Sequence, residues 1–198
     1  AHGPRHGRDD FDGYWGIWDE SFLQYAGEEM NALPEPFFAA LFTLSSHHPF
    51  VVPDAYRDLL PEGLTRNHKC VAYTDNAFRR FFARYAGEEW FRRTVFVFVA
   101  DHVSSEKFAD ATRVFPGDHH IIGLLYTPDG ALRGRYDEAV SPIDLMPTLL
   151  GLMGNREPYF AFGRDLFGEQ TPEGGFALAY DSGFEAVGGD RLLFFDEL

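Results

Sequence analysis

Apolar and polar positions fall into blocks along the chain that predict helices and strands in turn. The stretch 19–33 (DESFLQYAGEEMNAL) reads as a helix, because acidic residues occupy its first turn, where they favour the helix dipole. The stretch 68–86 predicts a second helix with an aromatic stripe that faces the core. Four residues at helical spacing form that stripe: Val71, Phe78, Phe82 and Tyr85.

Three shorter apolar blocks predict buried strands. Residues 37–44 (FFAALFTL) form a continuous apolar run whose length favours a buried parallel strand over a helix. Residues 94–100 (TVFVFVA) are β-branched and aromatic, and residues 121–126 (IIGLLY) end at a Thr-Pro-Asp-Gly turn. We therefore expect these blocks to lie in the interior of one sheet.

The remaining blocks complete an α/β pattern. Residues 53–60 predict a short helix or turn, and residues 141–153 predict a helix that Ser141 caps. Residues 176–180 and 191–195 predict late strands that pair as an edge hairpin. Strands that alternate with helices are typical of a mainly parallel sheet covered on both faces.

Composition narrows the class of protein. The chain has 198 residues, 45% of them hydrophobic, which suits one domain or a large piece of one. A formal net charge of -14 argues against nucleic-acid binding, which needs clustered Lys and Arg. Cys70 is the single cysteine, so no internal disulfide forms, and we expect a buried thiol on a helix. The polar residues 1–12 read as a flexible end, and no apolar run is long enough to span a membrane.

Polar side chains follow two of the predicted strands at the points where these strands end. His47 lies in a Ser-Ser-His-His loop after the run 37–44, and Asp101 and His102 follow the strand 94–100. Ligands bind outside the carboxyl ends of parallel strands, and carboxylate and imidazole groups suit Mn, Zn or Mg. The pattern therefore favours a metal or substrate site, although ordinary loop residues remain an alternative.

Seven segments, in order and in register over residues 15–167, resemble those of a known enzyme family. They are WGIWDE (15–20), FAALFTLSSHHPF (38–50), YTDN (73–76), TVFVFVADH (94–102), HIIGLLYTPDG (120–130), SPIDLMPTLLG (141–151) and FGRDLF (162–167). The family is the phosphoglycerol transferases of the alkaline-phosphatase/sulfatase superfamily, the lipoteichoic acid synthase-like type. The resemblance implies an alkaline-phosphatase-like α/β fold, with 13–198 as the C-terminal portion of a sulfatase-type catalytic domain that is truncated on its N-terminal side.

The resemblance also implies roles for individual residues. Asp101 and His102 match the family's metal-binding pair, which implies a divalent ion: Mn, Zn, Mg or Ca. His47 matches the histidine that contacts the phosphoryl group of the substrate, and so is the expected catalytic residue. His120 falls where some members place a histidine near the substrate or a second metal. Asp144, by contrast, fits a helix-cap or packing role.

The resemblance also implies features that this chain does not contain. Its nucleophile, a Thr, Ser or modified Cys, lies in the first half of the domain, so we expect this chain alone to be inactive, with its metal weakly bound or absent. We expect a membrane anchor upstream, a site on the extracytoplasmic face of the cell membrane, and a phosphate- or sulfate-ester substrate, including lipid- or glycan-linked ones. The alternatives are a sulfatase of the same fold and a non-catalytic module that binds a partner or a glycan.

Overall fold

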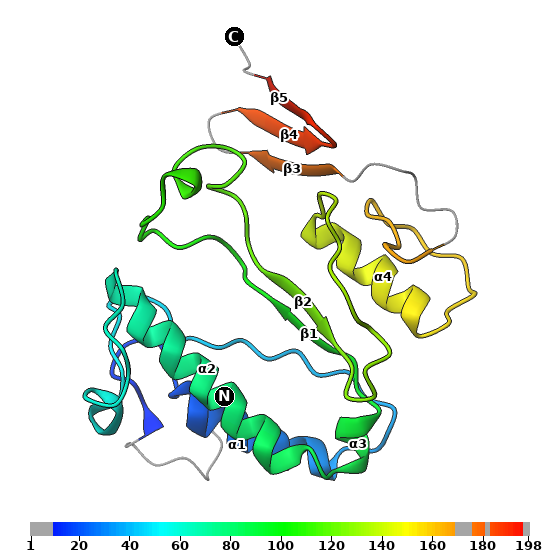
Figure 1. The fold of residues 1–198 in the computed structure, drawn as a ribbon. Helices are drawn as coiled ribbons and strands as arrows, with labels where there is room; N and C mark the ends of the chain where they lie inside the picture. The colour runs from blue at the N-terminus through cyan, green and yellow to red at the C-terminus, as the bar shows by residue number, and fades with distance from the viewer. Residues whose placement is uncertain (1–9, 169–175, 181–182, 196–198) are drawn as a thin grey trace. The chain divides into compact units, whose positions relative to one another are not determined.

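The chain folds into two compact units, which are described separately below. The computed structural model describes residues 10–168, 176–180 and 183–195 (Figure 1). Unit 1 comprises Ala1–Arg113 and Ile121–Arg133, and unit 2 comprises Val114–His120 and Gly134–Leu198. Most of the predicted flexible segment, residues 1–9, lies outside the described residues, so the division into 1–12 and 13–198 stays a prediction.

Helices α1 (Asp19–Ala32) and α2 (Arg66–Tyr85) form the base of unit 1, followed by the short α3 (Glu89–Arg92). The first two confirm the helices predicted from the sequence, and α2 begins at a capping box built by Thr65. The predicted turn after residue 53 is a single 3-10 turn, η2 (Asp54–Tyr56).

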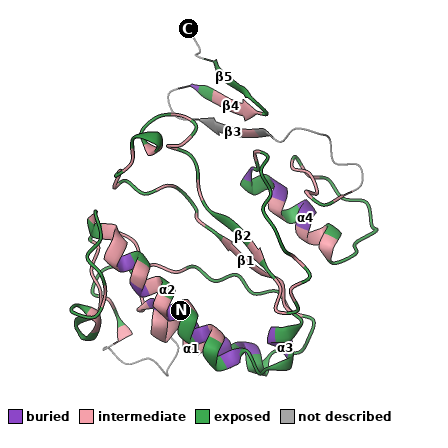
Figure 2. Ribbon diagram, in the orientation of Figure 1, coloured by how far each residue is buried: buried purple, intermediate pink, exposed green. Residues whose placement is uncertain are grey.

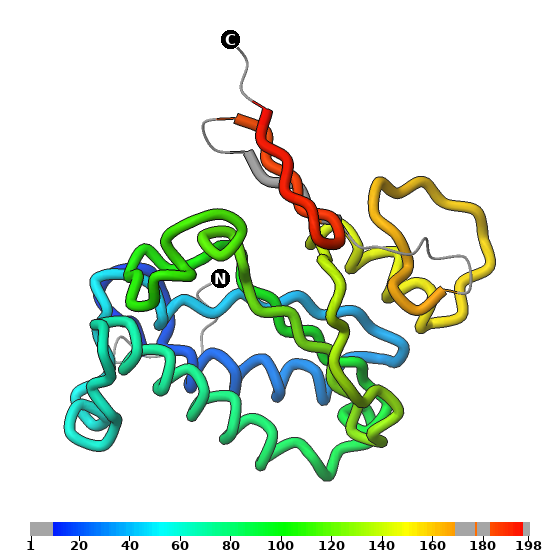
Figure 3. The backbone as a smooth tube through the Cα atoms, turned by 45° about the horizontal axis from the view of Figure 1, so that its top comes forward, coloured from blue at the N-terminus to red at the C-terminus, as the bar shows by residue number. Residues whose placement is uncertain are grey.

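The core of unit 1 lies where α1 and α2 pack side by side, as the views in Figures 1 and 3 agree. Figure 2 shows the buried positions gathering on these helices and on α3. The buried apolar cluster consists of Leu23, Ala26, Met30, Ala77, Phe81, Tyr85, Trp90 and Phe91. Burying such side chains contributes roughly 1.5–3 kcal/mol each, so this cluster dominates the stability of the unit.

The face of α2 that is buried differs from the predicted stripe. Of the four predicted residues only Tyr85 is fully buried, and Val71 is 50% exposed. The reason is that α2 packs on two sides: its buried residues face α1, whereas Phe78 and Phe82 contact the aromatic ring of Phe98 in the next strand, with centroids 5.1 and 6.1 Å away. A prediction of one buried stripe could not describe a helix that packs against two partners.

Strands β1 (Phe96–Val99) and β2 (Gly123–Tyr126) form a two-stranded antiparallel sheet, with Phe96 opposite Tyr126. Both strands were predicted, but the parallel arrangement was wrong for this pair, and the expected burial is only partial. The connection between them contains only a 3-10 turn, η3 (Asp110–Thr112). The connection, residues 100–122, is long enough for a parallel crossover, but it lacks the helix that usually makes one, and β2 pairs with β1 in the antiparallel direction.

The run 37–44 is extended, as predicted, but it is neither buried nor paired. Phe38 is 86% exposed and Phe42 is 64% exposed, and no strand in the described part of the chain forms a ladder with the run. Figure 1 shows it running in the same direction as β1, away from α3 and toward the beginning of α2. An apolar run indicates a tendency to leave water, but it does not specify the partner that would cover it.

The described residues of unit 2 form one α-helix and a small sheet. The predicted helix at 141–153 is a 3-10 turn, η4 (Pro142–Asp144), that continues into α4 (Leu145–Leu152). Strands β3 (Phe176–Tyr180), β4 (Phe184–Gly188) and β5 (Arg191–Phe195) form an antiparallel sheet in that order. The predicted edge hairpin was therefore wrong: β3 and β5 each pair with β4, a strand that the sequence analysis missed.

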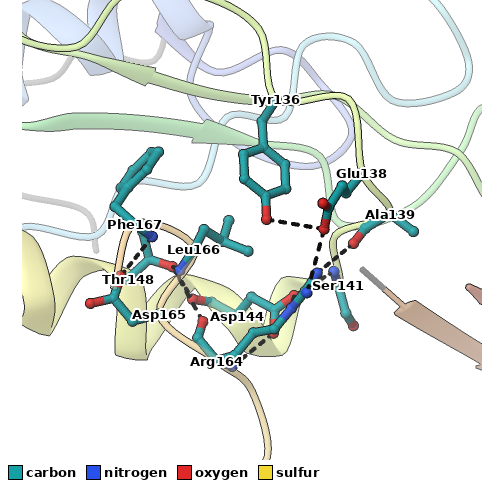
Figure 4. Close-up of polar contacts among 10 residues, drawn as sticks. All are labelled: Tyr136, Glu138, Ala139, Ser141, Asp144, Thr148, Arg164, Asp165, Leu166 and Phe167. Atoms are coloured by element: carbon teal, nitrogen blue, oxygen red, sulfur yellow. Dashed lines mark hydrogen bonds and ion pairs between the residues drawn. The ribbon is translucent and has the colours of Figure 1, made fainter. Parts of the chain in front are cut away.

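In unit 2, the buried carboxylate of Asp144 joins the segments 141–151 and 162–167 (Figure 4). Asp144 is 2% exposed, and its carboxylate accepts hydrogen bonds from the backbone N–H of Ser141 at 3.0 Å and of Arg164 at 2.9 Å. The Arg164 guanidinium in turn donates to the carbonyl of Ala139 at 2.8 Å and lies 3.7 Å from the Glu138 carboxylate. This confirms the helix-cap role predicted for Asp144 and explains why SPIDLMPTLLG and FGRDLF occur together.

Candidate functional site

His47 lies in a tight turn that follows the extended run 37–44. The backbone N–H of His47 donates to the carbonyl of Leu44 at 3.0 Å, and that of Phe50 donates to the carbonyl of His47 at 3.2 Å. The Nδ1 atom of His47 lies 3.0 Å from the carbonyl oxygen of His48. Because a carbonyl oxygen only accepts, Nδ1 carries a proton in this contact, and the lone pair of the neutral ring is on Nε2. His47 is partly buried and His48 is exposed, and the catalytic role of His47 stays a prediction.

Asp101 and His102 follow β1 directly, and their side chains approach each other. Asp101 Oδ1 accepts the backbone N–H of His102 at 2.9 Å, while Asp101 Oδ2 lies 3.6 Å from His102 Nε2. His102 Nδ1 lies 2.7 Å from the carbonyl oxygen of Val103, so Nδ1 carries the proton and the neutral ring has its lone pair on Nε2. Both side chains are more than half exposed. The pair thus presents a carboxylate oxygen and an imidazole nitrogen to the same space.

The two loops that carry these residues meet at the N-terminal end of α2. The guanidinium of Arg66 lies over the ring of Phe50, 5.4 Å from its centroid, and donates to Glu106 at 2.7 Å. Next to it, the Asn67 amide donates to Ser104 Oγ at 2.8 Å. The hydrogen bond from Arg66 lowers the pKa of the Glu106 carboxyl below its ordinary value. Arg66 therefore joins the His47 loop to the loop that begins at Asp101, a role that no sequence pattern indicated.

His120 belongs to unit 2, whereas the other three predicted site residues belong to unit 1. Its side chain is exposed, and its backbone N–H donates to the carbonyl of Gly117 at 3.3 Å. Its role near the substrate stays a prediction. Within residues 10–168, 176–180 and 183–195, no group of three or more His, Cys, Asp or Glu side chains gathers to hold a metal ion.

The sequence analysis missed the residue that holds the His47 turn. Asp19, in the WGIWDE segment, is fully buried, and its carboxylate accepts hydrogen bonds from the backbone of Leu44 and Ser45. The sequence analysis considered its charge only in relation to the helix dipole. The sequence holds no signal that marks Asp19 for burial, because an ionised carboxylate is costly to bury unless hydrogen bonds from other segments satisfy it.

Comparison with known proteins identifies the family. The sulfatase family model matches residues 5–155. The chain belongs to the sulfatase family. Lipoteichoic acid synthase-like YvgJ of Bacillus subtilis is 26% identical over 193 residues, which cover 86% of this chain and 30% of that protein. Lipoteichoic acid synthase 1 of Bacillus subtilis is 27% identical and covers 77% of this chain and 26% of its own length. Lipoteichoic acid synthase of Staphylococcus aureus is 25% identical over 170 residues.

A solved structure supports the fold of this sulfatase-family chain. A protein in the alkaline phosphatase superfamily from Vibrio parahaemolyticus aligns with a TM-score of 0.76 and 30% identity, covering 94% of this chain and 46% of that one. The α/β fold class and the resemblance to the lipoteichoic acid synthase-like type are therefore confirmed. The chain spans about 30% of the length of the first curated relative. None of the helices in the described part of the chain is long and apolar enough to cross a membrane.

Proposed function

We propose that this sulfatase-family chain supplies part of a metal-dependent site for phosphate-ester chemistry, most like that of a phosphoglycerol transferase. Membership of an enzyme family and similarity to lipoteichoic acid synthases support this function. One observation carries the proposal: Asp101 Oδ2 and His102 Nε2 lie 3.6 Å apart at the end of β1, and the hydrogen bond to Val103 leaves the Nε2 lone pair available.

The donor atoms of this pair suit a divalent cation, of the kind that the superfamily generally uses. Carboxylate oxygen and imidazole nitrogen bind Zn²⁺ at about 2.0–2.2 Å, so two ligands of one ion are separated by roughly 3–4 Å. The observed separation of 3.6 Å falls in this range. Mn, Zn, Mg and Ca all remain candidates. A bound ion would supply positive charge and Lewis acidity at the oxygen atoms of the ester.

His47 would act on the phosphoryl group itself. Its Nδ1–H is occupied by the carbonyl of His48, so Nε2 is the atom left for the substrate. In the protonated ring, Nε2–H donates a hydrogen bond to a non-bridging oxygen or a proton to the leaving oxygen. The ring of Trp15, whose centroid lies 4.5 Å from that of His47 at 62°, limits the orientations that the imidazole can adopt.

An anionic ester needs local positive charge, because the chain as a whole carries -14. A bound metal ion would supply it, because the Arg66 guanidinium between the two loops is already paired with the Glu106 carboxylate. We propose a phosphate ester as the substrate, including lipid- or glycan-linked ones. On the same resemblance, we propose that the site works at the extracytoplasmic face of the cell membrane.

The test is the substitution Asp101→Ala in the complete natural protein. Loss of one of two ligands from this chain should remove most of the bound metal and lower turnover of a phosphoglycerol ester by about 100-fold or more. Metal content is measured by elemental analysis after gel filtration, and activity by release or transfer of glycerol phosphate. A sulfate ester assayed in parallel distinguishes a sulfatase from a phosphoglycerol transferase.

Asp75→Ala is the matched control, because Asp75 is also an exposed carboxylate but lies on α2. We expect it to retain metal and activity. Retention of full metal content and full activity in Asp101→Ala would refute the assignment of Asp101 as a ligand.

A further inference from the structure

We infer that Asp19 is a positioning residue whose carboxylate fixes the turn that carries His47, an inference that rests on the proposed role of His47. Asp19 is fully buried at the first position of α1. Its Oδ1 accepts the backbone N–H of Leu44 at 2.9 Å and of Ser45 at 3.1 Å, and its Oδ2 accepts the Thr74 hydroxyl at 2.6 Å. Charge-assisted hydrogen bonds of this kind are stronger than neutral ones, and the N-terminus of the helix stabilises the negative charge.

The contact between Asp19 and the turn is reciprocal. The backbone N–H of Asp19 donates to Ser45 Oγ at 3.0 Å, and Ser45 is itself buried. Leu44 is held at both backbone groups, since its N–H bonds to Asp19 and its carbonyl accepts the N–H of His47 at 3.0 Å. Leu44 therefore connects the Asp19 carboxylate to the backbone of His47, so the position of the imidazole depends on Asp19.

A second contact from the same segment holds the other side of the turn. Trp15 Nε1 donates to the carbonyl of His48 at 2.7 Å, and its ring packs against that of His47. The segment also lies close to the turn, since a Cβ added to Gly16 would lie 2.9 Å from Leu44 Cδ1. Residues 15–19 thus hold the turn on both sides.

Asp19 also accepts the Thr74 hydroxyl of α2, but its carboxylate is not part of the apolar core between the helices. The α1–α2 core is formed further along the helices, by residues such as Leu23, Met30, Ala77 and Phe81. Loss of the carboxylate should therefore release the turn, with its buried N–H groups, more than it disturbs the core.

The experiment compares Asp19→Ala, Asp19→Asn, His47→Ala and the double variant Asp19→Ala/His47→Ala in the complete natural protein. We expect Asp19→Ala to lower kcat/KM for the phosphoglycerol ester by about tenfold or more, and the double variant to be no worse than His47→Ala alone. Asn keeps one oxygen for the two amides, so Asp19→Asn should retain more activity than Asp19→Ala. Amide hydrogen exchange at Leu44 and Ser45 should accelerate by about 10- to 100-fold in Asp19→Ala.

Asp144→Ala is the control for general loss of stability. It removes an equally buried carboxylate that accepts two backbone N–H groups in unit 2, so exchange at Leu44 and Ser45 should not change. Effects of Asp19→Ala and His47→Ala that multiply, or wild-type exchange rates in Asp19→Ala, would overturn the inference while the proposed function stands. Wild-type activity in His47→Ala would refute the proposed role of His47, and with it the positioning role.

Discussion

The packing of α1 on α2 depends on the absence of a side chain at Gly27. A Cβ at this position would lie 2.2 Å from Cε2 and 2.3 Å from Cζ of the Tyr85 ring, whereas carbon atoms in contact are about 3.5–4.0 Å apart. The ring cannot easily move away, because the Tyr85 hydroxyl donates to the carbonyl of Gln24 at 2.8 Å and the ring packs against Phe81 and Trp90. We therefore predict that Gly27→Ala destabilises unit 1.

The expected loss of stability is the sum of two destabilising contributions and one stabilising contribution. Overpacking a core costs about 1–3 kcal/mol, and breaking the Tyr85 hydrogen bond costs about 1 kcal/mol. Alanine in a helix interior is more favourable than glycine by about 1 kcal/mol. The net loss is therefore about 2 kcal/mol, which for a chain of this size lowers Tm by about 4–8 °C.

The assay is urea and thermal unfolding followed by the helical circular dichroism signal. Gly87→Ala is the matched control, because nothing lies within 4 Å of a Cβ at that position. The double variant Gly27→Ala/Tyr85→Leu should show a favourable coupling energy, since the smaller side chain removes the clash. Wild-type stability in Gly27→Ala would show that the helices do not approach this closely.

Two further predictions concern other parts of the chain. Burial raises the pKa of the Cys70 thiol to about 11, so the thiol stays protonated at pH 8.5. Iodoacetamide should therefore alkylate Cys70 at least about 100-fold more slowly in the folded protein than in urea-unfolded protein. Equal alkylation rates would contradict the burial of Cys70. In unit 2, a Cβ at Gly163 would lie 2.1 Å from the backbone carbonyl oxygen of Ile143. Gly163→Ala should therefore lower the thermal stability of that unit and expose Asp144 Oδ1. A melting temperature equal to that of the wild type would refute this close approach.

The sequence predicted helices better than sheets, for a physical reason. Helix hydrogen bonds are local, so α1 and α2 could be placed from end signals and spacing alone. Strand pairing depends on distant residues. The direction of the β1–β2 pair was therefore missed. Strand β4 pairs with its neighbours along the chain, and it was missed because its residues 184–188 (FEAVG), with a Glu and a terminal Gly, form a weak strand pattern. The prediction of which α2 residues are buried was wrong for a related reason, because tertiary structure sets the partners of α2 on its two sides.

The candidate site could be approached from the sequence because its residues lie beside recognisable strands. Asp101 and His102 directly follow β1, and His47 follows an extended run, so each was found from its neighbours along the chain. The contacts that bring these loops to one end of α2 could not be found in this way. Arg66 is separated from Glu106 by 40 positions, and no periodicity relates them.

The polar residues of the seven segments divide into two groups by their surroundings, and the division bears on function. Asp19 and Asp144 are buried, and both oxygens of each carboxylate accept hydrogen bonds, some of them from backbone N–H groups of another segment, so folding alone accounts for these residues. Asp101 and His102 are more than half exposed, and their hydrogen bonds reach only adjacent residues. An exposed pair of this kind contributes little to stability, about 0–1 kcal/mol. Substitution of Asp101 should therefore affect metal binding and turnover without lowering Tm, whereas substitution of Asp19 or Asp144 should lower Tm.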